Sequence, residues 1–379
     1  MKKIAFIGKP HYGGGYTRFC YLRRLLSDHK LYLLGIGKTN SSFEIKDKDY
    51  FVIANALSQK LEKRKITQLF LDFVEKEEIN IIIPMNSPIA VGAIPFISNA
   101  KIIQIVNSDT PRVYQYTATY IEWVSKVVCL TDKQVSELKK RISIQLHHKI
   151  TIIPHGVDII KTDPIVNKKN KLTIGFLGRV HQGHKNILLI PEILSRVNTN
   201  FEFHICGDGP DKKELLNRIE INQIPYIDHG AISNHLINDY LSKWDILLFP
   251  SFVEGFGITL IEAMNNGVVP IANILEGITD TIIDHNKNGF LVKNNAIFQY
   301  VDFIHSLDSN RELLHNMKLN AKAKVREKYD LNVIVEKYRE VFDEVSDSTK
   351  PKEAIGFDNW KPYKEYKPSI YQRIRNRLF

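Results

Sequence analysis

The sequence predicts an α/β protein with two doubly wound, parallel-sheet domains. Short apolar runs alternate along the chain with longer amphipathic stretches. Buried strands joined by helical crossovers are typical of parallel sheets covered by helices on both faces. The chain also has 379 residues, more than one hydrophobic core usually contains, so we expect two domains.

The apolar runs that we interpret as strands fall into two groups. In the first half of the chain they are residues 4–7, 31–34, 79–83, 102–106 and 127–130. In the second half they are residues 150–153, 172–177, 201–206, 245–249 and 268–272. The first run follows two lysines, but it is too short for a signal peptide, and we interpret it as a strand.

The stretches between these strands have helical periodicity. They predict helices over residues 17–27, 60–78, 131–141, 186–196, 212–222, 232–243 and 258–265, and later over 311–328 and 333–345.

Residues 161–171 interrupt the alternation. Their sequence, KTDPIVNKKNK, has no apolar period and contains one proline and four lysines, which is typical of a linker between domains. We therefore expect a first domain over residues 1–160, a second over 172–345, and a basic, aromatic tail over 346–379. Doubly wound domains bind ligands at the carboxyl ends of their strands, so we expect the two domains to face a central cleft.

The charge and the cysteine content indicate which partners and which compartment to expect. The chain has 52 basic and 42 acidic residues, a net charge of +10, which suggests acidic partners such as phosphorylated substrates, an anionic membrane or nucleic acid. The cysteines, Cys20, Cys129 and Cys206, form no CxxC pair and do not suggest a disulfide framework. No run approaches the length of a membrane span. We expect a cytoplasmic protein, either soluble or peripheral at the inner membrane face.

Residues 245–267, DILLFPSFVEGFGITLIEAMNNG, are the most informative segment. They predict a buried strand, a turn containing Glu254 and a Gly-Phe-Gly step, and a helix that carries Glu262. The first N–H groups of a helix have no internal acceptor and favour anions. Glu262, in the second turn, can accept hydrogen bonds from a diol. The segment therefore predicts a site for a phosphate beside hydroxyl groups, although Glu254 as a helix cap and Glu262 as a solvated side chain are the alternative interpretation.

Three loops after predicted strands add to this site. Arg179 and Lys185 lie in GFLGRVHQGHKN (175–186) and can neutralise a diphosphate. Gly207 begins a GDGP turn that either serves the turn alone or approaches a nucleobase. The glycine-rich loop that ends at Gly14 and Gly15 resembles a dinucleotide fingerprint but lacks its third glycine, so a nicotinamide cofactor is disfavoured. His181 and His184 have no accompanying carboxylate or cysteine cluster, so no metal site is expected.

One further motif, IPHGVD (153–158), ends the first domain. His155 lies where it could contact a substrate, but we favour a turn before the linker. In this order, IPHGVD, the Arg179 and Lys185 element, GDGP and the E-x7-E spacing from Glu254 to Glu262 resemble the family 4 retaining glycosyltransferases. The resemblance covers residues 150–290 most strongly. It implies the GT-B fold, with two Rossmann-like domains.

The resemblance also implies roles for individual residues. Arg179 and Lys185 would bind the diphosphate of a nucleotide sugar, and Glu262 its ribose hydroxyls. Glu254 and the backbone of Gly255, Phe256, Gly257 and Ile258 would contact the donor sugar and phosphate. Gly207 would approach the base, and Gly14 and Gly15 the diphosphate. No cofactor and no metal would be needed, because the nucleotide sugar is a co-substrate and cationic side chains replace the ion.

The first domain departs from the family pattern. Many relatives have a histidine near the start of the cleft, whereas here the strand ends read IIIPMNSP and IVNSDTP. Asn86, Asn107, Ser108 and Asp109 occupy these places, and Asn86 and Asp109 are the candidates to contact an acceptor.

We therefore expect a retaining glycosyltransferase, a hexosyltransferase, that transfers a sugar to a glycan or lipid-linked acceptor in bacterial cell-surface polysaccharide or glycoconjugate synthesis. The alternatives are an epimerase or phosphorylase on the same fold, or a non-enzymatic basic protein that binds polyanions. The basic tail predicts either contact with an anionic membrane or packing on the first domain. We expect no nucleic-acid partner, since basic residues are spread along the chain.

Overall fold

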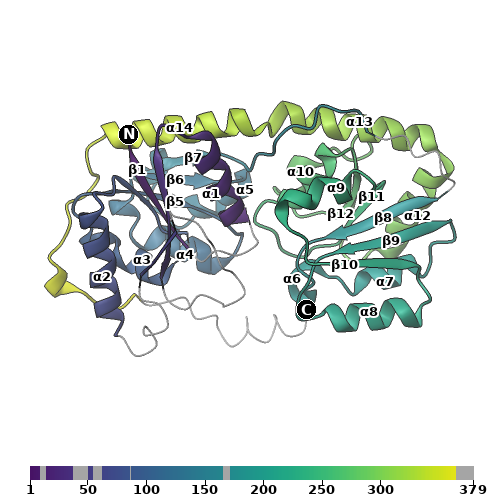
Figure 1. Cartoon of the computed structure of the whole chain (residues 1–379), viewed down its shortest axis with the longest axis horizontal. Helices are drawn as coiled ribbons and strands as arrows, with labels where there is room; N and C mark the ends of the chain where they lie inside the picture. Colours follow the sequence, from purple (N-terminus) through teal and green to yellow (C-terminus); the bar gives the residue numbers. More distant parts are fainter. Residues whose placement is uncertain (9–13, 37–49, 54–61, 86, 165–170, 364–379) are drawn as a thin grey trace. The chain divides into compact units, whose positions relative to one another are not determined.

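The computed structural model describes residues 1–8, 14–36, 50–53, 62–85, 87–164 and 171–363 (Figure 1). The chain forms two compact units. Unit 1 comprises Met1–His155 together with the segment that begins at Asn332, and unit 2 comprises Gly156–Leu331.

Unit 1 contains a seven-stranded parallel sheet in the order β3-β2-β1-β4-β5-β6-β7. Its strands are β1 (Lys3–Ile7), β2 (Lys30–Ile36), β3 (Tyr50–Ile53), β4 (Ile81–Ile83), β5 (Lys101–Ile105), β6 (Lys126–Cys129) and β7 (Ile150–Ile152). The strand order reverses between β1 and β4. At such a point the following loops diverge, which leaves room for a ligand at the carboxyl ends of the strands.

Helices cover both faces of the unit 1 sheet, which explains its apolar strands. Figure 1 shows α1 (Gly14–Leu25) and α14 (Leu331–Asp347) on one side of the sheet. The other side carries α2 (Lys63–Lys76), α3 (Pro88–Ala93) and α4 (Pro111–Thr119), while α5 (Asp132–Lys139) follows β6. The two faces receive alternate residues of one strand: Phe6 packs edge-on against Phe19 of α1, and Ala5 and Ile7 join the core that includes Phe70 of α2.

Unit 2 contains a six-stranded parallel sheet in the order β10-β9-β8-β11-β12-β13. Its strands are β8 (Leu172–Leu177), β9 (Phe201–Cys206), β10 (Tyr226–Gly230), β11 (Ile246–Phe249), β12 (Val269–Asn273) and β13 (Phe290–Val292). The order reverses between β8 and β11. The predicted doubly wound, parallel α/β architecture is therefore confirmed for both units.

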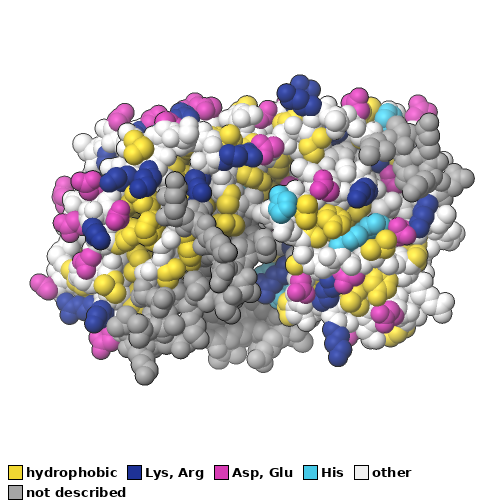
Figure 2. Space-filling view, viewed as in Figure 1, with side chains coloured by type: hydrophobic (Ala, Val, Ile, Leu, Met, Phe, Trp, Pro, Cys, Tyr) yellow, Lys and Arg dark blue, Asp and Glu magenta, His cyan; other side chains and the backbone are white. Residues whose placement is uncertain are grey.

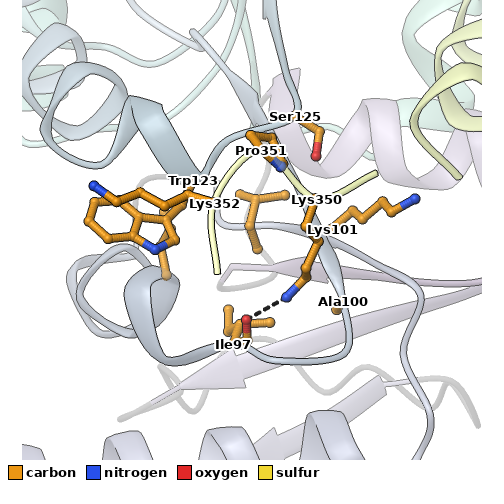
Figure 3. A pocket seen from close by; sticks show the side chains of 10 residues that line it. Ile97, Ala100, Lys101, Trp123, Ser125, Lys350, Pro351 and Lys352 are labelled. Carbon is orange, nitrogen blue, oxygen red and sulfur yellow. Dashed lines mark hydrogen bonds between the residues drawn. The ribbon is translucent and has the colours of Figure 1, made fainter. Parts of the chain in front are cut away.

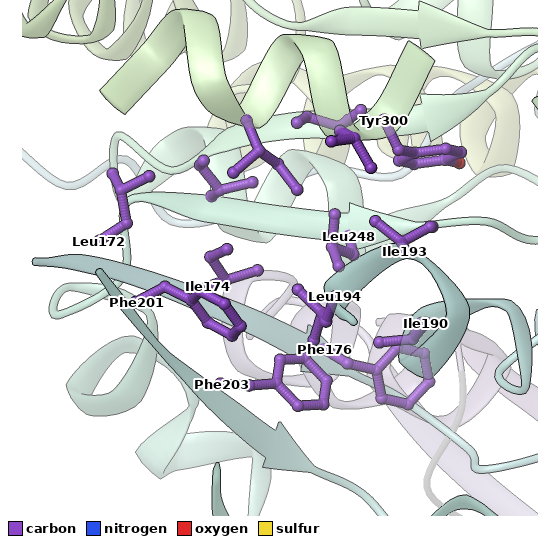
Figure 4. Close-up of a cluster of buried hydrophobic side chains, with 14 of the residues drawn as sticks. Leu172, Ile174, Phe176, Ile190, Ile193, Leu194, Phe201, Phe203, Leu248 and Tyr300 are labelled. Carbon is purple, nitrogen blue, oxygen red and sulfur yellow. The ribbon is translucent and has the colours of Figure 1, made fainter. Parts of the chain in front are cut away.

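The helices of unit 2 also lie on both faces of its sheet. In chain order they are α6 (Gln182–Lys185), α7 (Leu189–Leu194), α8 (Lys212–Ile221), α9 (Ile237–Leu241), α10 (Ile258–Asn265), α11 (Thr279–Ile282), α12 (Ile297–Ser309) and α13 (Arg311–Lys328). Figure 4 shows side chains of β8, β9, α7 and α12 meeting in a hydrophobic core of unit 2, among them Phe176, Phe203, Ile190 and Tyr300.

The position of α14 differs from the expected domain boundary. The sequence analysis assigned residues 333–345 to the second domain, whereas the helix packs in unit 1. Tyr338 and Phe342 are buried, and the Phe342 ring lies 6.3 Å from the ring of His29 in unit 1. Glu344 accepts from Lys126 Nζ at 2.6 Å. The periodicity of an amphipathic helix shows that it has an apolar face, but not which core receives that face.

Phe342→Ala tests this assignment. We expect a loss of about 3–5 kcal/mol, because the ring is fully buried and its removal leaves a cavity. Hydrogen exchange should show the lost protection in β1 and β2. Val333→Ala on the same helix, where the side chain is 54% exposed, should change stability by less than about 0.5 kcal/mol. Lost protection confined to β8–β13 would contradict the assignment.

Candidate active site

The two loops at the reversal of strand order in unit 2 are joined by an ion pair. Lys185, the last residue of α6, follows β8, and Glu254 follows β11. Lys185 Nζ lies 2.6 Å from Glu254 Oε1, and the two side chains are only 17% and 12% exposed. Lys185 Nζ also lies 5.0 Å from the centre of the Phe249 ring. The ammonium is therefore held at the carboxyl edge of the sheet by a carboxylate and an aromatic face.

Backbone hydrogen bonds fasten these loops together. Phe252 N–H donates to the His184 carbonyl at 2.8 Å. Arg179 is exposed on the loop after β8, one residue after Gly178. Burial, followed by the nearby charges of His181 and Arg179, lowers the pKa of His184. The loop that carries Arg179 and Lys185 therefore presents a positive field to any ligand.

Gly207 has a structural role in placing Arg179. Its N–H donates to the Gly230 carbonyl at 2.7 Å, and a Cβ built on Gly207 would lie only 1.9 Å from the Gly178 carbonyl oxygen. Only glycine permits this close approach of two loops. Of the two interpretations of the GDGP turn, backbone geometry is thus established, and contact with a base stays a prediction.

The turn before α10 is built as the sequence predicts. Gly257 caps the helix with φ +98°, a left-handed conformation that favours glycine. Phe256 is buried and packs edge-on against Tyr329 at 5.7 Å, so its ring anchors the turn. Gly255 and Ile258 flank this anchor and remain partly exposed. The anchored turn therefore fixes the position of the first N–H groups of α10.

Glu262 lies in the second turn of α10. The residue keeps some exposed surface, but its carboxyl group is surrounded by protein atoms, and this burial raises its pKa to about 8. No hydrogen bond to the carboxyl group is present among the described residues. A buried carboxyl without a partner is well suited to receive hydroxyl donors from a ligand.

The candidates in unit 1 have different surroundings. Gly14 begins α1 beside the His155 ring, and Gly15 lies against Met85. Asp109 Oδ1 accepts from the Tyr114 hydroxyl at 2.6 Å, and its Oδ2 lies 2.7 Å from Lys133 Nζ. An acceptor hydroxyl would have to share or displace one of these partners. Asn86 lies outside the described residues.

Several known proteins resemble this chain in sequence. The family model described as Glycosyl transferases group 1 matches residues 159–324. An uncharacterized glycosyltransferase of Haemophilus influenzae is 22% identical over 319 residues, which are 81% of this chain and 89% of that protein. The Escherichia coli enzyme named UDP-Gal:alpha-D-GlcNAc-diphosphoundecaprenol alpha-1,3-galactosyltransferase is 24% identical, over 58% of this chain and 60% of its own length.

A solved structure has the same architecture. The crystal structure of a Staphylococcus aureus TarM variant, in complex with Fondaparinux, alpha-GlcNAc-glycerol and UDP, superimposes with a TM-score of 0.74. It covers 92% of this chain and 100% of that one at 15% sequence identity, a level that establishes the fold alone. The match over residues 159–324 and these relatives support a family 4 glycosyltransferase. Its fold is GT-B, as the sequence analysis expected.

The surface and the tail of this glycosyltransferase bear on its partners. On the face in Figure 2, Lys and Arg side chains are interspersed with Asp and Glu, unlike the single basic stripe typical of a polyanion-binding surface.

The first part of the tail packs on unit 1. Figure 3 shows the crevice where Lys350 Nζ donates to the Ile97 carbonyl at 2.6 Å, and Tyr363 packs on Tyr116. Residues 364–379, with most of the basic charge, lie outside the described residues.

The described residues contain neither a candidate metal cluster nor a candidate membrane span. No group of three or more His, Cys, Asp or Glu side chains within them is placed to hold a metal ion. No helix in this part of the chain combines the length and the apolar character that a membrane span requires.

The sequence analysis missed one polar cluster in unit 1. Arg18 Nη1 donates to Asn107 Oδ1 at 2.7 Å, and its Nη2 lies 3.1 Å from His155 Nε2. Arg18 follows the glycine-rich loop and has the spacing of a solvated helix residue, so no local signal indicates that it is buried.

The raised pKa of Glu262 gives a pH-dependent stability difference. Because the folded-state pKa lies above the unfolded value, protonated Glu262 stabilises the free protein below about pH 4.5, and this contribution is lost as the pH rises towards 8. The amide of a Glu262→Gln variant does not ionise, so the variant keeps its stability over this pH range. We expect the stability of the variant relative to wild type to rise between pH 5 and 8, by up to about 1.4 kcal/mol per pH unit. Denaturant unfolding of both proteins at several pH values measures this, and a difference independent of pH would contradict it.

Proposed function

We propose that the chain is a retaining glycosyltransferase that uses a nucleotide-diphosphate sugar and a glycan or lipid-linked acceptor. The observation that carries the proposal is the ion pair between Lys185 and Glu254 at the carboxyl edge of unit 2. Lys185 would bind the diphosphate together with Arg179, and the Glu254 carboxylate would accept hydrogen bonds from sugar hydroxyls. The E. coli relative, named for transfer to a diphosphoundecaprenol-linked sugar, supports a lipid-linked acceptor in cell-surface glycan synthesis.

The ion pair suggests how donor binding prepares the site. A diphosphate placed at the first turn of α10 competes with Glu254 for Lys185, since both are anions within reach of one ammonium. When Lys185 turns to the diphosphate, the Glu254 carboxylate is released to accept hydrogen bonds from the donor sugar. Glu262 accepts the ribose hydroxyls, which favour its charged form. Donor binding thereby releases a proton from Glu262.

Bond cleavage follows from the same charges. As the bond between the anomeric carbon and the diphosphate breaks, negative charge grows on the leaving oxygens. Arg179, Lys185 and the N terminus of α10 lie where they stabilise this charge without reorganising. These groups supply the positive charge that a metal ion provides elsewhere, so we include metal independence in the proposal. Retention means that an α-linked donor gives an α-linked product.

Lys185→Ala tests the assignment. We expect kcat for sugar transfer to fall by about 100-fold or more, since a fixed donor to the leaving group is lost. Lys213→Ala, an exposed residue of α8, is the matched control and should leave kcat unchanged. Wild-type turnover should persist in EDTA, and NMR of the product should show the anomeric configuration of the donor.

The opposite results separate the alternatives. A Lys185→Ala enzyme within threefold of wild type would remove Lys185 from the site. Conversion of the nucleotide sugar to its epimer without any acceptor would indicate an epimerase.

We also propose that the basic tail binds an anionic membrane, because residues 364–379 continue from a segment anchored on unit 1 by Tyr363. Full-length protein should float with vesicles that contain anionic lipid, and a chain ending at Tyr363 should not. Equal flotation of both, or no flotation with anionic lipid, would contradict a membrane role. Neutral vesicles are the control for charge.

A further inference from the structure

Arg18 in α1 is a buried cation with no anionic partner among the described residues. The residue is 3% exposed, and its described hydrogen-bond partners are the neutral Asn107 and His155. Its Nε has no hydrogen-bond partner. A guanidinium without a carboxylate is costly to bury, so its retention at the carboxyl edge of the unit 1 sheet calls for a role there.

The donor-only chemistry of Arg18 fixes both neighbours. A guanidinium has five N–H donors and no acceptor. The atom of Asn107 that faces Arg18 at 2.7 Å must therefore be its oxygen, which turns the amide NH2 group away from Arg18. In the same way His155 must accept through Nε2, so the neutral ring carries its proton on Nδ1. Burial and the charge of Arg18 lower the pKa of His155 well below its usual value, in agreement with this tautomer.

Asn107 is placed to use its NH2 group on a ligand. It follows β5 by two residues and is half-buried. Its amide nitrogen has no hydrogen-bond partner among the described residues. The carboxyl ends of parallel strands are where doubly wound sheets bind ligands. Because Arg18 holds the carbonyl oxygen of this amide, the two N–H donors remain for a ligand, and they can recognise only an atom that accepts.

We propose that Asn107 is a substrate-binding residue, and that Arg18 is a positioning residue which acts through it. The NH2 group of Asn107 donates to an oxygen of the donor sugar nucleotide or of the acceptor glycan. This inference rests on the proposed glycosyl transfer and deepens it by assigning a binding role to a residue of unit 1.

Asn107→Asp gives a sharp test, since it separates recognition from structure. The variant carboxylate has the same shape and forms an ion pair with Arg18, so thermal stability should be equal or higher. Its outward atom accepts and cannot donate, so kcat/KM should fall at least about tenfold through the loss of a hydrogen bond and the new like-charge contact with the substrate oxygen. Asn99→Asp, on an exposed residue of the same unit, is the control for added charge and should keep wild-type kinetics.

The kinetics also identify which substrate Asn107 binds. If the oxygen belongs to the donor, the KM for the nucleotide sugar rises and hydrolysis of the donor without acceptor slows equally. If it belongs to the acceptor, donor hydrolysis stays at the wild-type rate while the KM for the acceptor rises. Asn107→Asp that keeps both parameters within twofold of wild type would overturn the inference.

A double-mutant cycle tests Arg18. An ammonium lacks the rigid planar geometry with which a guanidinium holds Asn107 and His155 at once, so Arg18→Lys should lower kcat/KM. It should have no further effect in an Asn107→Ala background if it acts through Asn107. Independent, additive losses would overturn the positioning role. If Arg18→Lys does not fold, the kinetics of Asn107→Asp and Asn107→Ala alone test whether Asn107 binds substrate. Loss of transfer in Lys185→Ala together with full activity in Asn107→Asp would leave the proposed function standing and only this inference refuted.

Discussion

The ion pair between Lys185 and Glu254 is the interaction on which the site in unit 2 depends. Each partner comes from a loop that follows a strand beside the reversal of strand order, and their side chains meet at 2.6 Å with little exposure to water. Reduced contact with water strengthens the attraction between the charges. The pair therefore keeps both groups in place before a ligand arrives. In the proposed function a diphosphate competes with Glu254 for the ammonium, and Lys185 turns to the diphosphate when the ligand binds.

Much of this site follows from local sequence. The strand Ile246–Phe249, the Gly-Phe-Gly turn and the helix over 258–265 appear as predicted, because each has a strong local signal: an apolar run, a pair of glycines and helical periodicity. The strands that the sequence analysis missed are β3, β10 and β13, and each lies at an edge of its sheet. β10 reads YIDHG and lacks the continuous apolar run that identified the central strands. β3 (YFVI) and β13 (FLV) are apolar, but they have only four and three residues and give a weak signal.

Other features depend on contacts that no local pattern contains. The helix predicted over 186–196 appears as α7 (Leu189–Leu194). The sequence analysis missed α6, which Asn186, left-handed with φ +50°, separates from α7. That break allows α6 to end at Lys185, which faces Glu254. The buried state of Arg18 and the placement of α14 in unit 1 likewise arise from packing between segments far apart in the chain. Side-chain periodicity indicates that a face is apolar, and only the tertiary structure determines what covers it.

A crystal structure of the protein bound to a nucleoside diphosphate tests the central claim most directly. The account predicts that diphosphate oxygens lie within hydrogen-bond distance of Lys185 Nζ at the first turn of α10, and that Lys185 no longer contacts Glu254. A bound nucleotide elsewhere, with the Lys185 and Glu254 side chains still paired at 2.6 Å as in the free protein, would contradict it.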